Sequence, residues 1–228
     1  MPKQNRVTPD GKIIAAPARG TFMGNRGILH NDQQEIVKPF AHKAWIICQL
    51  SFKGRRRALM QPGNYTELFF LDEATALAAG HRPCFECRRT AAEAFRDAWL
   101  AGNPQFGFGD SVKVGEMDAV LHAERLTDAY NIKNRKKRTY KAALRDLPGG
   151  TFILLEERPY LIWQAALLPW TPAGYEAPIS RPGEGQVVVL TPPSTVAALA
   201  QGYVPARHES AEVKGDSHLS TSQVKRCA

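Results

Sequence analysis

The stretch Leu71 to Arg89, LDEATALAAGHRPCFECRR, decides how this chain is interpreted. Asp72 stands where a helix N-cap belongs, good helix formers follow it, and Gly80 is placed to end the helix. Cys84 and Cys87 then form a CxxC turn, and a second helix follows, for which Thr90 and Glu93 predict a capping box. The sequence therefore predicts a cysteine pair held between two short helices.

A CxxC pair in such a turn is typical of a site in which two thiolates bind one zinc ion. A closed tetrahedral site needs four ligands, and Cys48, at the end of WIIC in the predicted strand KAWIICQLSF, is the expected third. For the fourth, His30 and His42 rank about equally and His81 ranks behind them. On a regular strand His42 would lie about 20 Å from Cys48, so that ligand requires a bend. A redox dithiol and a pair of buried thiols are the competing interpretations.

Composition indicates a folded, globular chain. Hydrophobic residues make up 43% of 228 residues, which is enough for a sizeable core and argues against disorder of the whole. No apolar run is long enough to span a membrane, and the first residues lack the apolar core of a signal peptide. We therefore expect a soluble, cytoplasmic protein.

The net charge of +8 is clustered, which favours nucleic acid, with DNA as the expected partner. The alternative is a solvated basic face without a partner. The residues expected to contact nucleic acid flank the CxxC or lie in two basic runs: Arg55, Arg56, Arg57, Arg82, Arg88, Arg89, Lys133, Arg135, Lys136, Lys137, Arg138 and Tyr140, the last by stacking.

The pattern of elements predicts an α+β fold, with a small zinc-stabilised N-terminal module and a mixed, β-rich C-terminal domain. Short strands and the two helices fill the first part, and the Gly-rich segment AGNPQFGFGD marks the boundary. Beyond it, MDAVLHAERLTDAY predicts a helix, TFILLEERPYLIWQ two strands joined at ERP, and QVVVLTPPSTVAALA a strand and a helix. The expected divisions are a flexible arm (1–19), the zinc module (20–106), the α+β domain (107–207) and a disordered tail (208–228).

The cysteine stretch resembles the second half of the metal-binding domain of Ada-type DNA alkylation-repair proteins, over residues 69–89. The matching residues, in order, are Glu73, Ala74, Ala79, Gly80, Arg82, Pro83, Cys84 and Cys87. The resemblance implies a zinc-bearing module that contacts DNA, and it implies that a zinc-bound cysteine could accept an alkyl group. The pattern departs from the family at Phe52, where a second upstream cysteine would be needed, and at His81, which replaces an aromatic residue. The C-terminal domain resembles no family.

Two enzymatic alternatives remain beside simple binding. In one, zinc-bound Cys48 is the alkyl acceptor, because a zinc-bound thiolate can be nucleophilic. In the other, Asp118 and His122, which share a helix face at i and i+4, serve a metal-dependent nuclease. A histidine on an amphipathic helix is more often structural, and the sequence alone does not decide whether any bond is made or broken. A third hypothesis is a scaffold whose C-terminal half presents an aromatic groove.

Overall fold

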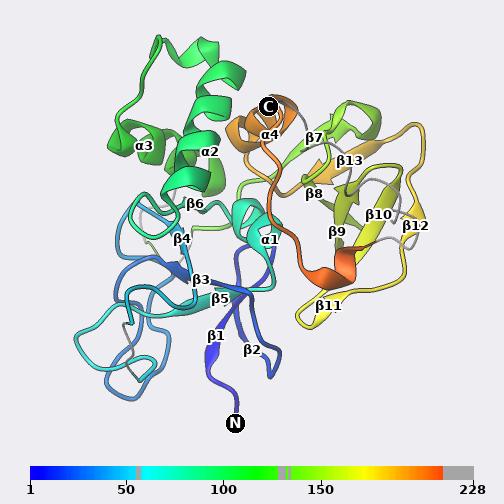
Figure 1. The fold of residues 1–228 in the computed structure, drawn as a ribbon. Helices are drawn as coiled ribbons and strands as arrows, with labels where there is room; N and C mark the ends of the chain where they lie inside the picture. The colour runs from blue at the N-terminus through cyan, green and yellow to red at the C-terminus, as the bar shows by residue number, and fades with distance from the viewer. Residues whose placement is uncertain (55–57, 128–131, 133–134, 213–228) are drawn as a thin grey trace, which may run out of the picture.

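The computed structural model describes residues 1–54, 58–127, 132 and 135–212, and it confirms the α+β class. The described residues form two β-sheets and four α-helices, and the first helix lies between the sheets (Figure 1). No helix among these residues is long and apolar enough to cross a membrane.

The first sheet carries the predicted cysteine strand. Its six strands run in the order β2-β1-β5-β3-β4-β6, with β1 parallel to β5, β4 parallel to β6 and the other pairs antiparallel. The strands are β1 (Gln4–Val7), β2 (Ile13–Ala15), β3 (Phe22–Asn25), β4 (Ile46–Cys48), β5 (Leu68–Phe70) and β6 (Arg82–Pro83). The segment 1–19, for which the sequence predicts an arm, thus contributes two strands, because Val7 is apolar and buried in the core.

Helix α1 (Glu73–Ala78) joins the two halves of the molecule, and all six of its residues are buried. The predicted N-cap is confirmed, since the Asp72 carboxylate accepts a hydrogen bond from the Thr75 backbone N–H at 2.8 Å. Gly80 follows the helix at φ +91°, and a Cβ there would come within 2.6 Å of the Arg125 side chain. A larger residue at position 80 would therefore be both strained and crowded.

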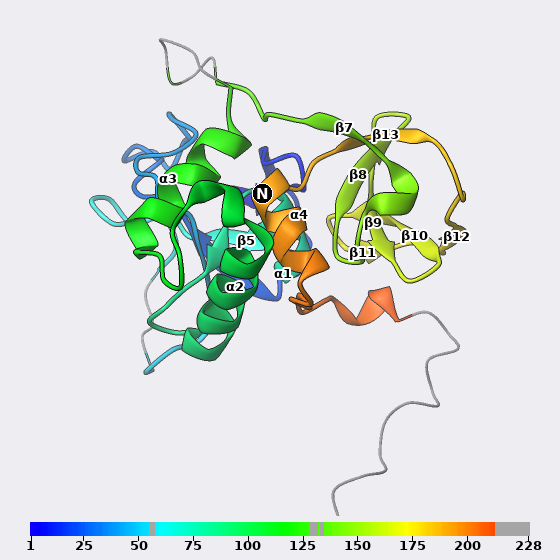
Figure 2. The same cartoon turned by 90° about the horizontal axis from the view of Figure 1, so that it is seen from above.

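Three further helices cover the first sheet: α2 (Arg89–Gly102), α3 (Val114–Arg125) and α4 (Pro193–Ala200). Helix α2 begins one residue before Thr90, and its N-cap, Arg88, makes no side-chain capping bond, so the predicted capping box is wrong. Phe95 and Trp99 of α2 are completely buried in one core with residues of the first sheet, α3 and α4. Helices α2, α3 and α4 lie together on one side of the molecule (Figure 2), and the predicted boundary near residue 106 separates residues of this one core.

The second sheet, with the order β11-β10-β9-β8-β13-β7 and β12 paired to β10, is antiparallel throughout. Its strands are β7 (Tyr140–Ala143), β8 (Phe152–Leu155), β9 (Arg158–Trp163), β10 (Ala166–Thr171), β11 (Gly174–Tyr175), β12 (Ile179–Ser180) and β13 (Gln186–Val189). The two predicted strands are confirmed, but they are joined at Glu156 and Glu157, both at positive φ, rather than at ERP, because Arg158 and Pro159 belong to β9. One face packs against Leu71, Ala74 and Ala78 at helix α1.

The chain returns to α1 after α4. Both oxygens of Glu73 accept hydrogen bonds from this segment, one from the Tyr203 hydroxyl at 2.7 Å and one from the Ala206 N–H at 2.9 Å. A short 3-10 helix, η4 (Glu209–Ala211), follows, and Ala211 is buried. The first residues of the predicted tail are thus packed, and residues 213–228 lie outside the described part of the chain.

Candidate metal centre

The parallel pairing of β4 with β6 sets the distance between Cys48 and the CxxC turn. Ile46 is opposite Arg82 and Ile47 is opposite Pro83, so the same register continued by one residue brings Cys48 beside Cys84. The Cys84 N–H donates to the Ile47 carbonyl at 3.0 Å, which fixes that position. Two strands from segments far apart in the sequence thus deliver one sulfur each to the same edge of the sheet.

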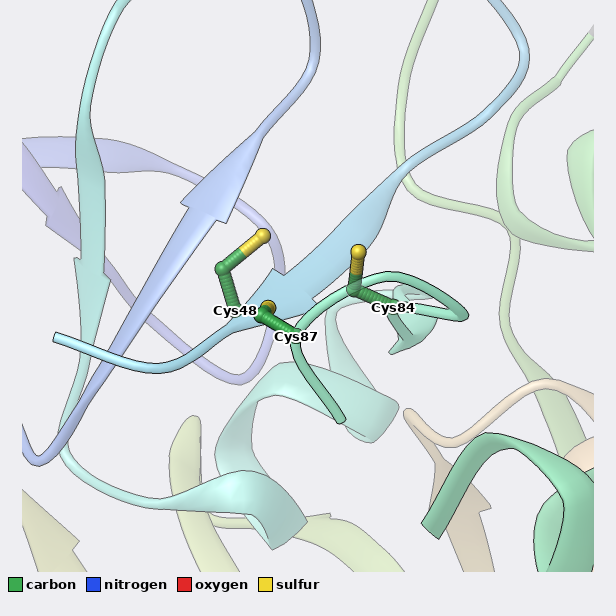
Figure 3. Close-up of side chains that lie close together, drawn as sticks. All are labelled: Cys48, Cys84 and Cys87. Atoms are coloured by element: carbon green, nitrogen blue, oxygen red, sulfur yellow. The ribbon is translucent and has the colours of Figure 1, made fainter. Parts of the chain in front are cut away.

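The turn after β6 brings the third sulfur, that of Cys87, to the same point. The ligand atoms of Cys48, Cys84 and Cys87 all lie within 4.8 Å of one another (Figure 3). Three sulfurs around a tetrahedral zinc ion, at about 2.3 Å each, would be about 3.8 Å apart, so a small adjustment would accommodate the ion. Cys48 and Cys84 are buried and Cys87 is half-buried. The site is therefore largely shielded from water.

Backbone N–H groups around the turn favour negative charge on sulfur. The Glu86 N–H donates to the Cys84 Sγ at 3.4 Å. The pKa of Cys84 falls to about 5, chiefly because Cys48 donates a hydrogen bond to its sulfur, with the Cys87 and Glu86 N–H groups adding to the effect. The pKa of Cys48 is raised, because its thiol donates to Cys84 and is buried. Burial also raises the pKa of Cys87.

This proton arrangement fits a metal site. One thiol of the cluster, that of Cys84, thus has a lowered pKa, and the other two have raised pKa values. A divalent cation would replace the thiol protons and stabilise all three thiolates, as metal binding to cysteine generally does. The donor set suits thiophilic ions, among which zinc is the usual occupant of a CxxC turn.

The histidines expected as the fourth ligand lie elsewhere in hydrogen-bonded positions. The two ring nitrogens of His30 lie 2.6 Å from the Thr66 hydroxyl and 3.3 Å from the Gln61 carbonyl oxygen. The Nε2 of His81 accepts a hydrogen bond from Arg26 at 3.1 Å, and the His42 ring lies beside Gly27. Within the described residues, the cluster of metal-ligating atoms contains the three sulfurs and no histidine nitrogen.

Met23 is a neighbour that the sequence analysis did not consider. It is paired with Cys48 across β3 and β4, so both side chains lie on the same face of the sheet. A thioether is a soft ligand, and its cross-strand position could have been found only once the register of these strands was known.

Asp118 and His122, the predicted nuclease pair, are engaged with arginines. Both Asp118 oxygens accept hydrogen bonds from the Arg82 guanidinium at 2.8 Å, and both side chains are only 5% exposed. The ring nitrogens of His122 lie 2.9 Å from Arg125 Nη2 and 3.3 Å from Arg135 Nη1. Burial lowers the pKa of His122 to about 4, with Arg125 and Arg135 contributing. Asp118 and His122 thus take part in hydrogen bonds with arginines that join α3 to other segments of the chain.

The residues predicted to contact nucleic acid fall into three groups. Arg82 is buried and Arg88 is half-buried, and each forms an ion pair with a buried carboxylate, Asp118 and Glu73 respectively. Those with exposed side chains are Arg89, Lys136 and Arg138, while Arg135, Lys137 and Tyr140 are half-buried. Arg55, Arg56, Arg57 and Lys133 lie outside the described residues.

Comparison with known proteins gives no family for this chain: no family model, no curated protein and no solved structure matches it. The resemblance to Ada-type domains therefore stays a prediction. What the structure adds is the buried group of three cysteines, which could bind a metal ion.

Proposed function

We propose that this protein binds one zinc ion through Cys48, Cys84 and Cys87 and acts at nucleic acid, with DNA as the expected partner. The observation that carries the proposal is the convergence of three sulfurs within 4.8 Å from two separate segments of the chain. A disulfide would join two of these residues, whereas a shared ion uses all three. Zinc, when bound, would fix the turn and neutralise the sulfur charge.

Three protein ligands leave one tetrahedral position for water, a substrate atom or a further side chain. Such an open position is the arrangement that zinc sites use to bind water or substrate. The alkyl-acceptor alternative suggested by the Ada resemblance needs instead a zinc-bound thiolate that an alkyl group can reach. Cys87 is the most accessible of the three sulfurs, because Cys48 and Cys84 are only 9% and 7% exposed. If a thiolate of this cluster accepts an alkyl group, Cys87 is thus better placed than Cys48.

The nucleic-acid part of the proposal rests on charge. The chain carries a net charge of +8, and Arg89, at the N-terminal end of α2 just after the cysteine turn, has a side chain that is 70% exposed. Arg138 is exposed near the end of α3. Contacts of this kind with phosphates give an affinity that falls steeply with salt concentration.

The metal part is tested by elemental analysis of protein purified without chelator. We expect about one zinc per chain, and Cys87→Ser should reduce the ratio strongly because the variant retains only two sulfurs. Cys227→Ser makes the same chemical change at the fourth cysteine and is the matched control. A ratio near zero in the unsubstituted protein, or equal ratios in the two variants, would contradict the metal assignment.

The nucleic-acid part is tested separately by titrating duplex DNA at several salt concentrations. Each phosphate contact contributes about 0.9 to the slope of log K against log salt, so Arg89→Gln with Arg138→Gln should reduce the slope by about 1.8. Arg145→Gln with Arg158→Gln, which removes two charges from the second sheet and its flank, is the control. Absence of DNA binding at low salt would refute this part and leave the metal result standing.

A further inference from the structure

A second site lies away from the cysteines, in a cavity of about 740 Å³ bordered by β2, residues 36–39, the end of α3 and the segment 135–137. Seven lysine and arginine side chains line it, and the only carboxylate among its lining residues is Asp10. Asp10 is paired with Lys12 at 2.7 Å. The cavity therefore has a large excess of positive charge.

Two of these cations are buried around Trp45. The guanidinium carbons of Arg26 and Arg125 each lie 3.9 Å from the centre of the Trp45 ring. Arg26 is 1% exposed and uses Nε to bind His81 and Nη1 to bind the Gly11 carbonyl at 3.1 Å. Its Nη2 is buried and makes no hydrogen bond with the described residues. The Arg125 Nε is also buried and makes no hydrogen bond with the described residues.

Among the described residues, no carboxylate forms an ion pair with Arg26 or Arg125. Burial lowers the pKa of Arg26 to about 9 and that of Lys137 to about 7, and for Lys137 the charges of Arg125 and Arg26 add to the effect. Buried charges are stable only when they are paired, and buried N–H donors cost free energy when they are left unbonded. An anion in the cavity would pair with the buried positive charges and accept hydrogen bonds from the unbonded N–H groups.

The remaining wall of the cavity is apolar and includes Ile13, Ile14, Ile36 and Val37. The volume falls within the range of small-molecule sites and exceeds what one phosphate ion needs. A ligand with an oxyanion group and an apolar organic group would match both the cationic side chains and the apolar wall of the cavity. Guanidinium groups and lysines are the residues that proteins use to bind phosphate.

We propose that this cavity binds an organic phosphate, with Arg26 Nη2 and Arg125 Nε as the buried donors and Lys38 and Lys136 at the rim. The proposal goes beyond the zinc and DNA functions and does not depend on the cysteines. The phosphate could belong to a free small molecule or to the 5′ end of a nucleic-acid strand, since both present the same monoester group.

The test is calorimetric titration of the full chain with thymidine 5′-monophosphate, with thymidine and with inorganic phosphate. We expect the monophosphate to bind and thymidine to bind at least about tenfold more weakly. Lys38→Gln with Lys136→Gln should weaken monophosphate binding by about tenfold, because two rim charges are lost. Lys113→Gln with Lys141→Gln, both exposed and outside the cavity, should change it less than twofold.

Arg26→Met should abolish binding, and if this variant does not fold, the rim pair decides the outcome. A 5′-phosphorylated oligonucleotide and its unphosphorylated counterpart distinguish the two sources. Preference for the phosphorylated strand assigns the site to strand ends, and equal binding of the two strands assigns it to free organic phosphates. Failure of the monophosphate to bind, or equal weakening by the rim pair and its control, would overturn the proposal.

Discussion

Replacing Asp118 with asparagine should destabilise this protein severely. The Asp118 carboxylate on α3 accepts two hydrogen bonds of 2.8 Å from Arg82, the first residue of β6, and both side chains are 5% exposed. The substitution leaves the Arg82 charge buried without its counter-ion. Removing one partner of a buried ion pair costs about 3–5 kcal/mol, a large share of the stability of an ordinary domain.

Urea denaturation followed by circular dichroism measures this cost as a lower midpoint at an unchanged slope. Asp97→Asn is the matched control, because Asp97 pairs with Arg96 at the same 2.8 Å on the surface, where the side chains are 64% and 35% exposed. Surface pairs contribute about 0–1 kcal/mol, so the control should stay near the unsubstituted protein.

A double change, Arg82→Met with Asp118→Leu, should recover most of the lost stability, since a buried ion pair can often be replaced by apolar side chains. The reasoning would be refuted if Asp118→Asn lowered the free energy of unfolding by less than about 1 kcal/mol. The same experiment bears on the nuclease hypothesis: a catalytic Asp118 would give a stable variant that loses DNA cleavage.

Three further outcomes are expected. Chelation of the metal should lower the melting temperature of the zinc-loaded protein, and re-addition of zinc should restore it; an unchanged melting temperature would show that the ion contributes nothing to the fold. Tyr175→Phe removes the 2.8 Å hydrogen bond from its hydroxyl to the buried Asp72 carboxylate and should cost about 1–3 kcal/mol in urea unfolding, whereas Tyr160→Phe on the half-buried strand β9 should cost less. The lowered pKa of His122, about 4 against a usual 6.5, means that the folded state binds fewer protons than the unfolded state between these values, so its contribution is present above pH 6.5 and lost as the pH falls toward 4. His122→Gln should therefore reduce the loss of stability between pH 7 and pH 5, and an equal loss in both proteins would contradict this.

The parts of the fold that the sequence predicts correctly depend on local chemistry. The Asp72 cap and the glycine that follows α1 each follow from conformations available to a few adjacent residues. The grouping of Cys48 with the CxxC turn is also confirmed, because few sulfurs were available to complete such a site.

The features that the sequence does not predict depend on contacts between segments that are far apart along the chain. Arg82 and Arg88 look like surface arginines beside a cysteine turn, and only the folded chain reveals Asp118 and Glu73 as their partners. The capping box at Thr90 fails because α2 starts one residue earlier, directly from the cysteine turn. The cavity around Trp45 could not be predicted either, because it joins the N-terminal strands to residues more than a hundred positions away.

The stretch around the cysteines is anchored by more than the proposed ion, and this determines what the ion can do. Arg82 binds α3, the Cys84 N–H binds the Ile47 carbonyl of β4, and Arg88 binds Glu73 of α1 at 2.8 Å. Glu73 in turn holds the segment that follows α4. Because these contacts do not pass through sulfur, loss of metal should loosen the turn locally and leave both sheets folded. An ion bound by the three cysteines would therefore act at the edge of a fold that these other contacts also hold together.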